Sequence, residues 1–72
     1  MSEFDTLKNM LDRNGAKYVE EVEKEITTTF LCIPALKDEF LILGFDEDGN
    51  LMYVDAGGDW DDYLKRVEAR GE

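Results

Sequence analysis

The chain holds few side chains that could carry out catalysis. Its 72 residues include no histidine and a single cysteine, Cys32. Without an imidazole the sequence lacks the commonest general base, a frequent metal ligand and the usual activator of a serine or cysteine nucleophile. Cys32 stands in an apolar stretch shortly before Pro34, which predicts a buried and unreactive thiol. We therefore expect no enzyme and no cofactor.

Carboxylates are the other candidates for chemistry, and they gather in two short segments. In the first, Asp46 and Asp48 precede Asn50, a pattern that suggests a calcium loop. An EF-hand loop needs Gly at its sixth position and Glu at its twelfth. Counted from Asp46, Gly49 is the fourth residue and Gly57 the twelfth, so we expect a hairpin turn here and no metal.

The second segment carries aspartates on both sides of a pair of glycines. Asp59 is a natural helix N-cap, and Asp61 and Asp62 would lie in the first turn, where they complement the helix dipole. The same carboxylates could hold a divalent cation weakly, because hard cations prefer oxygen ligands. The structural interpretation is favoured, and weak cation binding stays open as an alternative.

The charge balance favours a protein partner. The chain has 8 basic and 18 acidic residues, a net charge of −10. Such a charge repels DNA, RNA and anionic membranes, so we expect a partner with a basic surface instead. The alternative is that the charge serves solubility alone. The predicted binding residues are the carboxylates of the two segments: Asp46, Glu47, Asp48, Asp55, Asp59, Asp61 and Asp62.

A helix is expected at each end of the chain. Ser2 can cap the first, over 2–13, and Gly15 can end it in the left-handed conformation. The second should span 59–69. Both carry apolar residues at helical spacing. These are Phe4, Leu7, Met10 and Leu11 in the first, and Trp60, Tyr63, Leu64 and Val67 in the second.

Four strands are expected between the helices, over 16–21, 26–33, 39–45 and 51–55. Asp48-Gly49 between two apolar runs predicts a tight hairpin. The charged stretch 20–25 could instead continue a short helix, but the β-branched residues that follow favour a strand and a turn. We therefore predict one α+β domain over 1–72: an N-terminal helix, a four-stranded antiparallel meander and a C-terminal helix.

The central strands are apolar on both faces, whereas a sheet with one face in water should alternate. Either the helices cover opposite faces, or one face meets a partner or another copy of the chain. The second arrangement leaves a homo-oligomer, such as a homodimer formed through an apolar face or a sheet edge, as an alternative function. We expect one face to carry Leu41, Leu43, Phe45, Leu51 and Tyr53, and the other Phe40, Ile42, Met52 and Val54.

Cysteine usage and the N-terminal residues bear on the compartment. One cysteine cannot form an intramolecular disulfide, which favours a reducing, cytoplasmic setting. The first residues resemble no signal peptide, and the longest apolar run, 40–45, is too short to cross a membrane. We therefore expect no membrane partner.

The layout resembles that of short accessory proteins encoded by bacteriophages and prophages. The resemblance lies in the small capped helix, the segments NGAKYVEE and FDEDGNLMYV, and the acidic final helix. It implies a small accessory or inhibitor protein, including the anti-defence types, some of which are acidic proteins that occupy basic channels. No functional residue is carried over from the resemblance.

Overall fold

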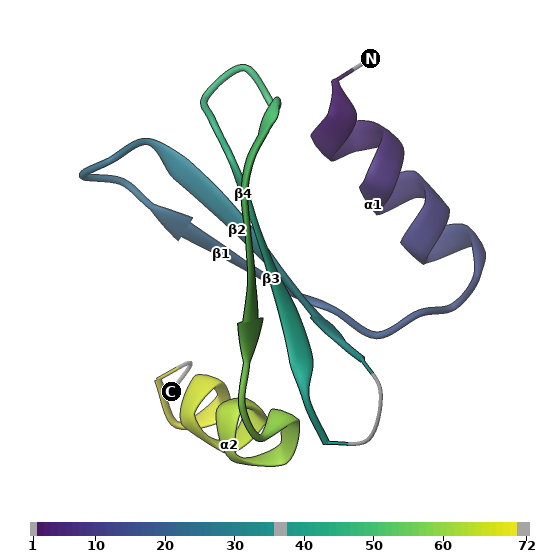
Figure 1. Ribbon diagram of the computed structural model, residues 1–72, viewed down its shortest axis with the longest axis vertical. Helices are drawn as coiled ribbons and strands as arrows, with labels where there is room; N and C mark the ends of the chain where they lie inside the picture. Colours follow the sequence, from purple (N-terminus) through teal and green to yellow (C-terminus); the bar gives the residue numbers. More distant parts are fainter. Residues whose placement is uncertain (1, 36–37, 71–72) are drawn as a thin grey trace.

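The computed structural model describes residues 2–35 and 38–70, and it confirms the predicted order of elements (Figure 1). The strands form one sheet in the order β1-β2-β3-β4, and all neighbours are antiparallel. The α+β meander expected from the sequence is therefore correct. The connection expected between the strands over 26–33 and 39–45 lies partly outside the described residues. The elements are α1 (Glu3–Arg13), β1 (Val19–Glu23), β2 (Thr28–Pro34), β3 (Phe40–Phe45), β4 (Leu51–Gly57) and α2 (Trp60–Arg70).

The first strand begins later than the sequence predicted, at Val19 instead of residue 16. The residues between α1 and β1 are held by the end of the helix. The N–H of Ala16 donates to the carbonyl of Leu11 at 2.9 Å, and the Tyr18 hydroxyl donates to Asp12 at 2.8 Å. These bonds complete the helix C-terminus, so the chain is free to pair with β2 only from Val19 onward.

The second strand also begins later, at Thr28, because Ile26 and Thr27 belong to the β1–β2 turn. Thr27 has a φ of 47°, an uncommon backbone conformation for a β-branched residue. The buried Thr28 hydroxyl donates to the carbonyl of Ile26 at 3.0 Å, which fixes the exit from the turn. The charged stretch 20–25 forms strand and turn, and not the helix that remained as an alternative.

Side-chain caps place both helices as predicted. The Ser2 hydroxyl accepts the N–H of Asp5 at 3.1 Å at the start of α1. At α2, the Asp59 carboxylate accepts the N–H of Asp62 at 3.2 Å. Each bond satisfies one of the N–H groups that a helix leaves free at its first turn.

The two helices lie on opposite faces of the sheet, the first of the two arrangements left open by the sequence (Figure 1). On the α1 face, the ring of Phe4 meets that of Phe45 edge-on, with 5.2 Å between the centroids. Leu31 and Phe45 are fully buried there. On the other face, α2 covers only the end of the sheet near Phe40.

A β-bulge overturns part of the predicted face assignment. Phe45 pairs with Leu51, but Gly44 pairs with Tyr53, so Met52 is an extra residue in β4. Because side chains alternate along a strand, one extra residue transfers every later side chain to the opposite face. Tyr53 therefore lies on the α2 face and Val54 on the α1 face, the reverse of the sequence-based assignment.

An aromatic cluster attaches α2 to the sheet. Phe40 stacks on Tyr63 with 4.7 Å between the ring centroids and packs against Trp60 at 5.6 Å. Trp60, from the apolar positions expected on this helix, is buried with Cys32 and Phe40. Gly57, at the end of β4, lies directly against the Phe40 ring, and a β-carbon at this position would overlap it.

Alanine substitution of the two glycines before α2 should distinguish the packing of Gly57 against Phe40 from a general effect of replacing a loop glycine. Gly57→Ala should lower the free energy of unfolding by about 1–3 kcal/mol, because the Phe40 ring must leave its stack. Gly58→Ala should stay within about 0.5 kcal/mol of the parent, since no atom lies within 4 Å of an added β-carbon there. Urea denaturation measures both, and equal losses would contradict the packing role of Gly57.

Candidate binding surface

The predicted carboxylates lie at opposite ends of the β3–β4 hairpin and do not form one cluster. Asp46, Glu47 and Asp48 occupy the β3–β4 turn. Asp59, Asp61 and Asp62, with Asp55 beside them in sequence, lie at the other end, where β4 leads into α2 (Figure 1). The seven residues of β4 span ~23 Å between the two groups.

Asp46 holds the hairpin turn together. Its carboxylate accepts the N–H groups of Asn50 at 2.9 Å and Asp48 at 3.0 Å. These hydrogen bonds, led by the one from Asn50, keep the pKa of Asp46 below its ordinary value. Gly49 takes a left-handed backbone (φ 84°) in the same turn. The hairpin predicted here is therefore correct.

Three carboxylates at the α2 end also have structural partners. Asp55 accepts the Tyr53 hydroxyl at 2.8 Å and the N–H of Ala56 at 2.8 Å, and these bonds lower its pKa. Asp59 caps α2, and Asp62 pairs with Arg66 at 2.7 Å.

The other carboxylates of the predicted set are available to a partner. Within residues 2–35 and 38–70, the carboxylates of Glu47, Asp48 and Asp61 make no hydrogen bond or ion pair. No three Asp, Glu or Cys side chains of these residues come together in a way that could hold a metal ion. The weak cation site left open by the sequence therefore has no candidate location in this part of the chain.

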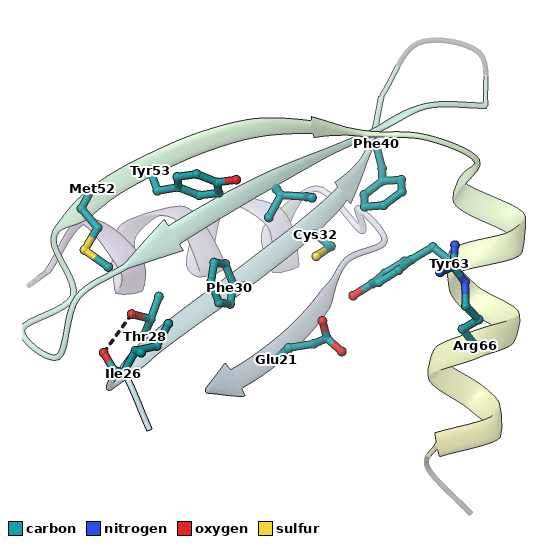
Figure 2. Close-up of a pocket in the computed structure, with 11 residues that line it drawn as sticks. Glu21, Ile26, Thr28, Phe30, Cys32, Phe40, Met52, Tyr53, Tyr63 and Arg66 are labelled. Carbon is teal, nitrogen blue, oxygen red and sulfur yellow. Dashed lines mark hydrogen bonds between the residues drawn. The ribbon is translucent and has the colours of Figure 1, made fainter. Parts of the chain in front are cut away.

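An open apolar groove crosses the α2 face of the sheet (Figure 2). It has a volume of about 670 Å³ and reaches from β1 to β4, with α2 closing one end. We call it the sheet groove. Its apolar lining includes Ile26, Phe30, Cys32, Phe40, Ile42, Met52 and Tyr53.

Much of the groove lining faces solvent. Ile26 is 59% exposed and Met52 is 56% exposed, although both are large apolar side chains. Phe30 and Tyr53 meet edge-on across the groove, with 6.3 Å between their centroids. Sequence reasoning missed this surface because the bulge at Met52 is what brings Tyr53 to this face. Only the apolar character of both faces of β2 and β3 indicated that one face could be left uncovered.

Two charged side chains border the groove near α2. Glu21 comes from β1 and Arg66 from α2 (Figure 2). Arg66 pairs with Asp62, and Arg70 pairs with Glu21. Both arginines are thus engaged by carboxylates of this chain, so they add no free positive charge to the groove.

Two groups on the groove wall near α2, the Tyr63 hydroxyl and the Cys32 thiol, are neutral at physiological pH. The Tyr63 hydroxyl is buried and has no hydrogen-bond partner among the described residues. Burial raises the pKa of Tyr63 far above its ordinary value, and it also raises the pKa of the Cys32 thiol. Neither group offers an activated nucleophile, so this wall is suited to contact with apolar groups.

A scan against protein-family models finds no match to the chain, and searches of curated proteins and of solved structures find none either. No helix among the described residues is long and apolar enough to cross a membrane.

The Cys32 thiol should react slowly in the native protein. Cys32 is 2% exposed and its pKa is raised, so reaction with a thiol reagent requires local opening. We expect labelling about 100-fold slower than in the urea-unfolded chain, because a few kcal/mol are needed to open a buried strand. The absorbance of the thiolate that the reagent releases measures both rates. Native labelling within tenfold of the unfolded rate would contradict the buried placement of this thiol.

The Asp46 carboxylate should stabilise the fold in a pH-dependent way. Its pKa is lower in the folded than in the unfolded chain, so the stabilisation is complete above the ordinary value of about 3.9. It is lost as the pH falls through the folded-state value. Asp46→Ala should therefore lower the urea midpoint at neutral pH, and its difference from the parent should shrink as the pH falls through the folded-state pKa.

Glu47→Ala is the matched control, because its carboxylate makes no hydrogen bond within the described chain. It removes the same charge from the same turn and should leave the midpoint nearly unchanged across this pH range. A loss in Asp46→Ala that is as large in acid as at neutral pH would show that the ionised carboxylate is not responsible.

Proposed function

We propose that this protein is a module that binds another protein. The docking surface of that partner is basic and presents apolar side chains at its centre. The observation that carries this proposal is the sheet groove: an open apolar surface across four strands in a chain of net charge −10. Exposed apolar side chains gathered in an open groove are a common feature of protein-binding surfaces, because burial against a partner releases the water ordered around them.

The lining suits contact with a protein. Phe30, Tyr53 and Met52 belong to the residue types enriched at the centres of protein interfaces. Methionine adapts its shape to different partner surfaces, and tyrosine offers a large rigid contact area. Burying apolar surface contributes about 25 cal/mol per Å², so burial of the groove lining adds to the driving force for binding.

The net charge selects the partner. A charge of −10 steers a basic surface toward the protein and repels nucleic acids and anionic membranes. The free carboxylates lie at the two ends of β4, with Glu47 and Asp48 in the turn before it and Asp61 in the first turn of α2. The resemblance to phage and prophage accessory proteins leads us to propose a host protein as partner, inhibited by occupation of its basic surface. The lone Cys32 suits a reducing, cytoplasmic setting.

Selection from a library of random peptides tests this proposal. Twelve-residue peptides displayed at low salt should be enriched for Lys and Arg around apolar or aromatic residues. The best peptide, synthesised and titrated by fluorescence anisotropy, should lose about tenfold in affinity between about 50 and 500 mM NaCl, because salt screens exposed charges. Enrichment that ignores charge, or affinity that ignores salt, would contradict a basic partner.

Three glutamate substitutions at equally exposed apolar residues locate the binding surface. Ile26→Glu and Met52→Glu place a charge in the groove and should weaken the selected peptide about tenfold each, or about 1.4 kcal/mol. Val22→Glu adds the same charge at a residue that is 60% exposed on the α1 face, and should change affinity little. Equal losses of affinity in all three variants would show that the peptide does not bind in the groove.

Self-association is the second candidate function, favoured by four consecutive exposed apolar residues in β4. They are Leu51, Met52, Tyr53 and Val54. Two copies of charge −10 repel each other, so a homodimer should strengthen with salt, the opposite of the basic partner. Analytical ultracentrifugation at low and high salt distinguishes them. We expect a monomer at both, and a dimer that grows with salt would favour this second function.

A further inference from the structure

The two edges of the sheet are built differently. β1 forms one edge and carries glutamate at three of its five positions: Glu20, Glu21 and Glu23. Charged side chains at this density are a common protection against pairing with another strand. β4 forms the other edge and has one charged residue, Asp55, among seven. The sheet is thus protected by charge along one edge, whereas β4 carries little charge and departs from a regular edge only at the bulge at Met52.

The backbone of β4 is open to pairing at its centre. Near its ends, the N–H of Leu51 donates to Glu3 at 3.2 Å and that of Ala56 donates to Asp55 at 2.8 Å. Among the described residues, no side chain hydrogen-bonds the backbone of Met52, Tyr53 or Val54. In an edge strand, alternate N–H and carbonyl groups point away from the sheet and have only water as a partner.

Carboxylates lie at both ends of this open strand. Glu47 and Asp48 occupy the turn that leads into β4, and Asp61 lies in the first turn of α2 beyond it. None of the three has a partner among the described residues. The strand therefore presents an apolar centre with a negative end on either side, separated by ~23 Å. Figure 2 shows Met52 and Tyr53 extending from this strand over the groove.

We infer that β4 receives an extended segment of the partner as a fifth strand, with apolar residues at its centre and a Lys or Arg near each end. This inference rests on the proposed function and specifies its mode of binding. Backbone hydrogen bonds to the centre of β4 supply affinity, and alternate side chains of the added strand enter the sheet groove beside Met52 and Tyr53. The carboxylates at the two ends set the register by pairing with the basic residues.

Charge decides against a second copy as the occupant. A second β4 would bring another Asp55 and another set of end carboxylates to the same edge, in a protein that already carries −10. Like charges brought together across an interface are destabilising. A basic extended segment replaces this repulsion by attraction at both ends of the strand.

Three synthetic peptides test strand addition directly. The probe is a nine-residue peptide, Lys-Lys-Val-Thr-Val-Thr-Val-Lys-Lys, with blocked ends. Its controls are two versions methylated on backbone nitrogens at alternate residues, one for each edge. Methylation removes N–H donors while it keeps charge and side chains. The parent peptide should bind, and the version methylated on the pairing edge should bind about tenfold more weakly, the value of one to two lost hydrogen bonds.

Amide hydrogen exchange shows where the peptide lies. The central amides of β4 should become protected when the unmethylated peptide binds, and those of β1 should not. Equal binding by all three peptides, absence of binding, or contacts confined to the groove would overturn strand addition. Contacts confined to the groove would leave the proposed function standing. Protection of β4 at high protein concentration without peptide would overturn the inference in favour of a second copy.

Two charge-matched double variants test the end carboxylates. Glu47→Gln with Asp48→Asn removes two negative charges at one end of β4 and should weaken the probe at least threefold. Glu23→Gln with Glu25→Gln removes the same charge beside the β1–β2 turn, at the opposite edge of the sheet. The loss of affinity in this variant should be less than half of the loss in the first variant. Equal losses would mean that only net charge matters, which contradicts a register set at the ends of β4.

Discussion

A four-stranded sheet that is apolar on both faces needs more cover than two short helices can give, and this mismatch shapes the protein. Each helix has eleven residues, ~16 Å of length and ~10 Å of width. Four strands spaced ~4.8 Å apart, with strands up to seven residues long, present a larger area on each face. α1 lies along one face and buries Leu31 and Phe45. α2 is held at the end of the other by its aromatic contacts with Phe40, so the rest of that face stays open.

The position of α2 depends on a small residue in an edge strand. Gly57 leaves the space that the Phe40 ring occupies, and that ring in turn stacks on Tyr63 and meets Trp60. A larger residue would displace α2 from the sheet or the ring from the cluster. The groove and the helix that closes it therefore depend on the same contact.

The sequence predicted the order and type of every element because the local signals agree. Ser2, Asp59 and the Asp48-Gly49 turn each have a clear physical role, and each performs it in the structure. Prediction from the sequence failed where a long-range or irregular feature of the fold determines the position of a side chain. The bulge at Met52 leaves no signal in the alternation of apolar residues, so Tyr53 and Val54 were assigned to the wrong faces. The candidate carboxylates are close in sequence, yet the length of β4 separates them into two groups, some with purely structural roles.

The bulge also affects how readily copies of the protein could aggregate through the exposed apolar edge. A regular, flat strand of this composition would invite one copy after another to stack into a fibril. The extra residue at Met52 increases the local twist and interrupts the even spacing that an endless ladder requires. The β1 edge, rich in glutamate, blocks growth from the other side. Both features oppose the repeated stacking of copies onto the sheet.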